Sequence, residues 1–146
     1  MYVFNHIVPL EDCRAARAVF HRIASEDDDG EVVERFWALP ADAGLWKLVS
    51  IPFFATDLSL GDLVEVDPDG FIREVSARSG RRTLRIWLKD RSQIEIHGIL
   101  DAIVRAGGLI ERSSGHLYSI DAKTESIAVN VIELLEALNC MYEIAN

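Results

Sequence analysis

The histidines and cysteines are the first residues to consider for chemistry, because they are common general bases, nucleophiles and metal ligands. Cys13 and Cys140 lie near opposite ends of the chain and belong to no CxxC or Cys/His cluster. No serine lies in a GxSxG elbow, and no pair of histidines has HxxxH or HExxH spacing. The sequence therefore predicts no metal, no cofactor and no enzymatic activity. The histidines are His6, His21, His97 and His116.

Charge is distributed unevenly along the chain. The 24 Asp and Glu residues outnumber the 15 Lys and Arg residues, which gives a formal charge of −9. This excess disfavours DNA and anionic membranes as partners and suits a basic protein. Six basic residues lie within residues 78–91, where they are expected either to neutralise nearby acids or to meet an anionic ligand. They are Arg78, Arg81, Arg82, Arg85, Lys89 and Arg91.

Residues 1–31 are expected to form an N-terminal helix and an acidic linker. In LEDCRAARAVFHRIA, residues 10–24, apolar side chains recur at the spacing of one helical face. SEDDDGE then interrupts the pattern with a charged loop. It lacks the spaced oxygen ligands of a calcium-binding loop, so we interpret it as a linker. The helical stripe comprises Leu10, Cys13, Phe20 and Ile23, with Ala16 or Arg17 between.

Residues 32–82 are expected to form a small β-rich subdomain that resembles a barrel. EVVERFWALP and LWKLVSI both end near a proline, and DLVEV and FIREVSA flank a Pro-Asp-Gly turn. Strands this short and closely spaced are typical of a barrel or a curled sheet. The residues expected to face inward in the hairpin are Val64, Val66, Ile72 and Val75.

Residues 83–146 are predicted to form a ferredoxin-like β-α-β-β-α-β half, which makes the whole chain α+β. RTLRIWLK is a strand, and SQIEIHGILDAIVRAGG has one apolar face and a Gly-Gly stop. LIERS and HLYSIDA form a hairpin, TESIAVNVIELLEALN a second helix and CMYEIA a last strand. The helical residues expected to face the core are Ile96, Ile99, Leu100, Ile103, Val104, Ile127, Val131, Leu134, Leu135 and Leu138.

Three short segments in the middle of the chain resemble a known family. They are Glu34-Arg35-Phe36-Trp37, residues 51–55 (IPFFA) and residues 59–64 (SLGDLV). In this order they resemble a bacterial family known mainly as a domain of unknown function, whose members carry ER-W, IPFFA and S-GD-V motifs. The resemblance is clearest over residues 32–80. It supports a fold and implies no activity or catalytic residue.

The IPFFA and SLGD segments are interpreted as control of the backbone. Pro52 cannot donate to a strand ladder, so the chain must leave the sheet or lie at its edge there. Phe53 and Phe54 would anchor this corner, with one of them able to line a pocket. Gly61 permits a turn in which Asp62 binds neighbouring amides, and alternation places Glu65 on the opposite face.

The leading hypothesis is a cytoplasmic, non-enzymatic protein-binding module, in its most specific form an immunity protein that neutralises a basic toxin. It requires no cofactor and is compatible with a homodimer. The residues expected to bind the partner are Glu26, Asp27, Asp28, Asp29, Glu31, Asp67 and Asp69. The alternative is a sensor of an anionic metabolite in a cleft between the two halves. The residues expected to line that cleft are Phe53, Phe54, Arg78, Arg81, Arg82 and Arg85.

Overall fold

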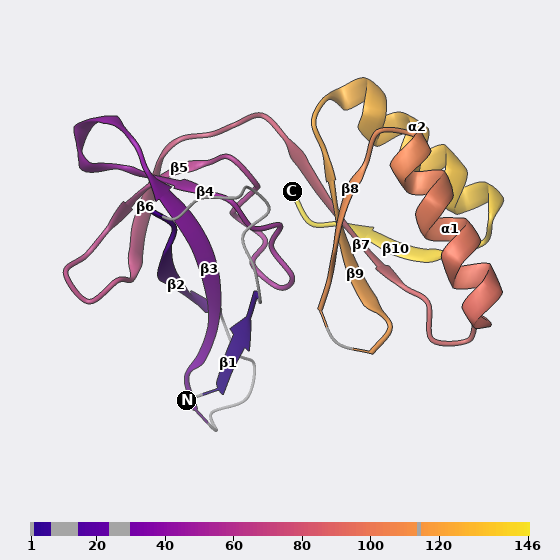
Figure 1. Cartoon of the computed structure of the whole chain (residues 1–146), viewed down its shortest axis with the longest axis horizontal. Coiled ribbons are helices and arrows are strands. Elements are labelled where there is room, and N and C mark those ends of the chain that lie inside the picture. Colours follow the sequence, from indigo (N-terminus) through magenta and orange to yellow (C-terminus); the bar gives the residue numbers. More distant parts are fainter. Residues whose placement is uncertain (1, 7–14, 24–29, 114) are drawn as a thin grey trace. The chain divides into compact units, whose positions relative to one another are not determined.

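The chain folds as two units, residues 1–79 (unit 1) and 80–146 (unit 2), with a β-sheet in each (Figure 1). The structure is a computed structural model that describes residues 2–6, 15–23, 30–113 and 115–146. Two helices and two mainly antiparallel sheets confirm the predicted α+β class. Within the described ranges, no helix has both the length and the apolar character that a membrane crossing requires.

Unit 1 is organised around its longest strand, β3. One edge of β3 pairs with β2, and the other edge pairs with β1 near its start and with β4 near its end. The sheet continues from β4 to β5 and β6. The elements are β1 (Tyr2–Asn5), β2 (Arg17–Ile23), β3 (Val32–Pro40), the 3-10 turn η1 (Asp42–Gly44), β4 (Trp46–Leu48), β5 (Leu63–Val66) and β6 (Ile72–Ala77).

The predicted N-terminal helix is wrong where the structure describes it, because residues 17–23 form β2. The segment RAVFHRI contains β-branched and aromatic residues, and it pairs with β3 along seven successive residues. Val19 is buried in the core of unit 1, and Phe20 donates its N–H to the Gly70 carbonyl at 2.8 Å. Tertiary pairing therefore overrides the helical spacing. Leu10 and Cys13 lie outside the described residues.

The sheet of unit 1 curls without closing into a barrel, so of the two predicted forms it is the curled sheet that is found. Strand β2 meets the chain just before β6 through one isolated bridge, Phe20 to Phe71, and not through a continuous ladder. The ring centroids of Phe20 and Phe71 lie 5.5 Å apart. Gly70, with φ of +90°, permits the tight turn there, and a Cβ at this position would already contact the Phe20 ring at 3.4 Å.

Unit 2 has the predicted element order, with two helices over one face of a four-stranded sheet (Figure 1). The strand order is β10-β7-β9-β8, and every neighbouring pair is antiparallel. The elements are β7 (Arg82–Trp87), α1 (Gln93–Arg105), β8 (Leu109–Arg112), β9 (Leu117–Ala122), α2 (Glu125–Ala137) and β10 (Met141–Ile144).

Both helices begin at a side-chain cap. The Ser92 hydroxyl accepts from the N–H of Glu95 at 3.2 Å, and the Thr124 hydroxyl accepts from the N–H of Ile127 at 3.2 Å. Such caps satisfy amides that the first turn leaves without partners. The predicted inward residues pack in the core or against it, except Val104, which is 56% exposed. The buried helical residues are Ile96, Ile99, Ile103, Ala128, Val131 and Leu135.

Candidate functional site

A buried carboxylate organises the IPFFA segment. Glu34, in β3, is fully buried, and its Oε1 accepts from the N–H of Phe53 at 2.6 Å. Its Oε2 accepts from the N–H groups of Phe54 at 3.1 Å and Ala55 at 2.9 Å. The Nε2 of His6 lies 2.8 Å from Oε1. The carboxylate thus binds the amides of a segment that leaves the sheet at Pro52, where strand pairing cannot satisfy them.

The protonation of this pair follows from its surroundings. Burial raises the pKa of Glu34, but the hydrogen bond and charge of His6 and the amides of Phe53 and Ala55 lower it, and the net pKa lies below its usual value. An ionised carboxylate only accepts hydrogen bonds, so Nε2 of His6 is the donor. The His6 ring also stacks on Phe53, with centroids 3.9 Å apart. This network holds the backbone and is closed to solvent.

A second buried carboxylate fixes the SLGD turn. Asp62 Oδ2 accepts from the N–H of Ser59 at 2.9 Å, and Oδ1 accepts from the N–H of Ser79 at 2.8 Å. Asp62 is 1% exposed, whereas Glu65 is exposed. The structure therefore places both residues as alternation predicted. Asp62 joins the turn before β5 to the chain after β6.

The residues predicted for a ligand cleft have partners within their own units. Phe53 is buried beside His6, and Phe54 is half-buried. Arg78 lies in unit 1, where its Nη1 donates to the Asp57 carbonyl at 2.7 Å. In unit 2 three arginines meet carboxylates. They are Arg81 with Asp121 at 3.0 Å from Nε, Arg82 with Glu125 at 3.0 Å, and Arg85 with Glu143 at 2.6 Å.

The Arg81–Asp121 pair shows how burial competes with pairing. Arg81 Nε lies 3.0 Å from both carboxylate oxygens of Asp121, which is itself fully buried. Burial raises the pKa of Asp121, while the hydrogen bond and charge of Arg81 lower it, and the net pKa is above its usual value. The ion pairs of Arg81, Arg82 and Arg85 match one of the two alternatives expected for this basic stretch, the neutralisation of nearby acids.

The predicted acidic residues have different surroundings. Glu26, Asp27, Asp28 and Asp29 lie outside the described residues. Glu31 pairs with Arg22 at 2.6 Å. Asp67 closes the β5–β6 turn, since its Oδ1 accepts from the N–H groups of Asp69 and Phe71, each at 2.9 Å. The Asp69 side chain is exposed on that turn.

The β5–β6 hairpin carries two further acids that sequence analysis missed as a pair. Glu65 and Glu74 lie directly opposite each other on neighbouring strands, and both are exposed. Like charges in this position destabilise a sheet. Val66 pairs with Ile72, so a regular register would pair Glu65 with Arg73. A register shift between Glu65 and Val66 pairs Glu65 with Glu74 instead. We call Glu65, Asp69 and Glu74 the hairpin acids.

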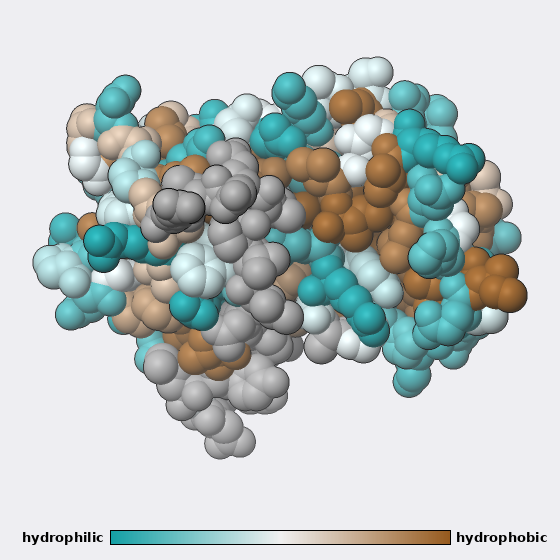
Figure 2. Space-filling view, viewed as in Figure 1, coloured by the Kyte–Doolittle hydropathy of each residue, from teal (hydrophilic) through white to brown (hydrophobic). Residues whose placement is uncertain are grey.

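The acidic excess belongs to unit 1. Residues 1–79 contain fifteen acidic and seven basic residues, a formal charge of −8, while residues 80–146 contain nine and eight. Figure 2 shows hydrophilic residues at the end of unit 1 where Figure 1 places the β5–β6 hairpin. Among the described residues, no group of three or more His, Cys, Asp or Glu side chains is arranged to hold a metal ion.

Comparison with known proteins places the chain in a family. A crystal structure titled as a novel structure of a hypothetical protein from Neisseria gonorrhoeae has a TM-score of 0.68 and 20% sequence identity, and the match covers 88% of this chain and 94% of that one. At this identity the likeness shows the fold alone. No curated protein matches the chain. The model of a family described as Domain of unknown function (DUF4265) matches residues 34–145, and the chain therefore belongs to that family.

Proposed function

We propose that this protein is a non-enzymatic protein-binding module whose hairpin acids receive the basic surface of a protein partner. Its most specific form is an immunity protein that neutralises a basic toxin in the cytoplasm. The observation that carries the proposal is the exposed Glu65–Glu74 pair, in which two negative charges lie directly opposite each other on neighbouring strands.

The energetics of this pair favour a cationic partner. Opposed like charges cost a sheet on the order of 0.2–1 kcal/mol. Neither glutamate has a hydrogen bond or an ion pair with any described residue. A lysine or arginine of a partner that lies between them would remove this repulsion and form two ion pairs. Such complementary charges accelerate association and fix the register of an interface.

The net charge of unit 1 extends the same argument to longer range. A formal charge of −8 on 79 residues attracts a cationic protein before contact, over about one Debye length of 8–10 Å. Asp69 lies at the turn of the same hairpin, while the Asp67 carboxylate accepts hydrogen bonds from the turn backbone. Asp69 is therefore the more available of the two predicted turn acids. Glu31, which pairs with exposed Arg22, is a secondary contact.

A sensor of anionic metabolites is less well supported, because arginines proposed to bind the metabolite already form ion pairs within the protein. Arg81, Arg82 and Arg85 each meet a carboxylate of unit 2. An incoming anion would have to compete with those carboxylates. We also propose that unit 2 is ferredoxin-like, since its strand order β10-β7-β9-β8 suits two split β-α-β units. The ER-W, IPFFA and S-GD-V motifs would then be the family's backbone-fixing residues, through Glu34 and Asp62.

The proposal is tested by affinity capture from the native host with the full chain. The wild type is compared with Glu65→Gln/Glu74→Gln and with the control Asp101→Asn/Glu133→Gln, which changes the charge of unit 2 by the same amount. We expect one stoichiometric basic protein with the wild type and the control, and its loss with the hairpin variant. No stoichiometric partner, or equal capture by both variants, would overturn the proposal.

A further inference from the structure

A turn after β7 presents two charged side chains beside an apolar surface of unit 2. The N–H of Arg91 donates to the Leu88 carbonyl at 3.3 Å and closes the turn, with Lys89 and Asp90 at its central positions. Leu88 is buried and anchors the turn to the core. The side chains of Lys89 and Asp90 are thereby directed away from the core.

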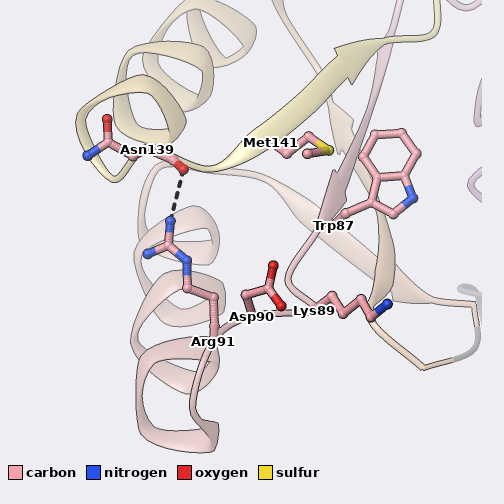
Figure 3. Close-up of a pocket in the computed structure, with 6 residues that line it drawn as sticks. All are labelled: Trp87, Lys89, Asp90, Arg91, Asn139 and Met141. Carbon is pink, nitrogen blue, oxygen red and sulfur yellow. Dashed lines mark hydrogen bonds between the residues drawn. The ribbon is translucent and has the colours of Figure 1, made fainter.

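The turn borders a cavity of about 500 Å³ formed within unit 2 (Figure 3). This volume lies in the range of pockets that bind small molecules, about 300–1,000 Å³. The cavity lies where β7 ends and β10 begins, next to the end of α2. Its lining residues are Trp87, Lys89, Asp90, Arg91, Asn139 and Met141.

Trp87 and Met141 form the apolar wall of this cavity. They are directly opposed on β7 and β10, and their exposed fractions are 37% and 70%. Figure 3 shows the two side chains next to each other at the same side of the pocket. A flat indole and a flexible thioether are suited to contact an apolar or aromatic group of variable shape.

Arg91 serves the fold more than the cavity. Its Nη2 donates to the carbonyls of Leu138 at 2.7 Å and Asn139 at 2.9 Å, which end α2. Its Nη1 also lies 3.9 Å from the carboxylate of Glu95. A cation at the end of a helix satisfies its last carbonyls and interacts favourably with its dipole. Arg91 therefore shapes one side of the cavity and has little capacity for a ligand.

Lys89 and Asp90, in contrast, have no hydrogen bond or ion pair with any residue that the structure describes. Figure 3 shows the Asp90 carboxylate pointing toward the space between Asn139 and Trp87, while Lys89 extends the other way, beneath Trp87. The cavity thus offers one carboxylate and one ammonium group, set apart from each other beside an apolar wall. A simple anion would be repelled by Asp90, and a simple cation by Lys89.

We propose that this cavity binds a zwitterionic small molecule, an α-amino acid with an apolar or aromatic side chain. The ligand's ammonium group binds Asp90, its carboxylate binds Lys89, and its side chain lies against Trp87 and Met141. Both charges of the turn are then paired by opposite charges of one ligand. The cavity lies in unit 2 and the hairpin acids lie in unit 1, so either proposal can fail without the other.

The first test compares free and blocked ligands on the full chain. Wild-type protein is titrated with leucine and phenylalanine, with their N-acetyl forms and with their amides, and binding is followed by NMR chemical shifts. We expect both blocked forms to bind at least about tenfold more weakly, since each loses one charge-assisted contact. No binding of either free amino acid at concentrations up to about 10 mM, or equal binding of all forms, would overturn the proposal.

The second test assigns each contact to a residue. Asp90→Asn should remove the preference for a free amino group and retain the preference for a free carboxylate, and Lys89→Met should do the reverse. The control Lys123→Met, at an exposed site after β9, should retain both preferences. Unaltered preferences in Asp90→Asn and Lys89→Met would contradict the assignment even if the wild type binds amino acids. Thermal unfolding of each variant verifies that it is folded.

Discussion

Replacing Glu34 by glutamine tests whether its carboxylate holds the IPFFA segment. The side chain keeps its size but loses its charge, and an NH2 group replaces one of two oxygens that each accept two hydrogen bonds. At least one buried donor, the N–H of Phe53 or of Ala55, then loses its acceptor, at about 1–3 kcal/mol. We expect a loss of about 1–3 kcal/mol in the free energy of unfolding of unit 1, a substantial part of a typical domain stability of about 5–15 kcal/mol.

The assay must report on unit 1 alone. Trp37 and Trp46 lie in unit 1 and Trp87 lies in unit 2, so a Trp87→Phe background restricts tryptophan fluorescence to unit 1. Urea unfolding is then compared for Glu34→Gln and for Glu65→Gln, an identical substitution at an exposed position of the same sheet. The control should not destabilise unit 1, and it should stabilise it by at most about 1 kcal/mol because it removes the repulsion between Glu65 and Glu74. A loss below about 1 kcal/mol in Glu34→Gln would refute the reasoning.

Three further predictions concern pH, surface charge and thiol reactivity. Folding lowers the pKa of Glu34 from 4.5, so ionised Glu34 stabilises unit 1 above that pH, and this stabilisation is lost as the pH falls below it. Unfolding of unit 1 measured at a series of acidic pH values should show this loss of stability. The loss should be smaller in Glu34→Gln. Glu74→Lys should stabilise unit 1 by about 0.2–1 kcal/mol in urea unfolding by turning a repulsive pair with Glu65 into an attractive one, and a destabilised variant would show that the pair is not repulsive. Burial raises the pKa of Cys140, and the charge of Arg91 opposes this only in part. In a Cys13→Ser background, a thiol reagent should therefore label the native protein at least about tenfold more slowly than the unfolded protein. Equal labelling rates would contradict the burial of Cys140.

The fold of unit 2 could be predicted from sequence because its signals are local. Apolar residues recur with the helical period in residues 93–105 and 125–137, and Ser92 and Thr124 cap these helices. The strands between them are bounded by clear turn residues. The prediction that Val104 faces the core was wrong, because the residue lies beside the buried stripe of the helix and not within it. Local patterns of this kind give the order of the elements and most of the core.

Strand β2 shows where local signals fail. Phe20 and Ile23 fit a helical stripe, but the same residues also suit a strand when a partner is present. That partner is β3, which begins at Val32, nine residues after the end of β2 at Ile23. A short amphipathic segment does not by itself determine whether it forms hydrogen bonds internally or with another strand. The sequence likewise did not decide between a barrel and a curled sheet, because closure depends on contacts between residues distant in sequence.

The candidate site was predictable in its parts and not in its pairing. Asp67 and Asp69 were recognisable from the turn sequence, but a regular register outward from Val66 and Ile72 would place Glu65 opposite Arg73. The bulge places Glu74 opposite Glu65 instead, and no residue type in the hairpin predicts the bulge. The role of Glu34 was also hidden, because its partners lie nineteen to twenty-one residues further along the chain and are backbone amides.

Hydrogen exchange on the captured complex tests the central claim most directly. Amide exchange is measured by mass spectrometry for the free protein and for the protein with its partner from the native host. The account predicts added protection in residues 63–77, the β5–β6 hairpin, and its loss together with binding in Glu65→Gln/Glu74→Gln. A stable complex in which residues 63–77 exchange as in the free protein would contradict the account.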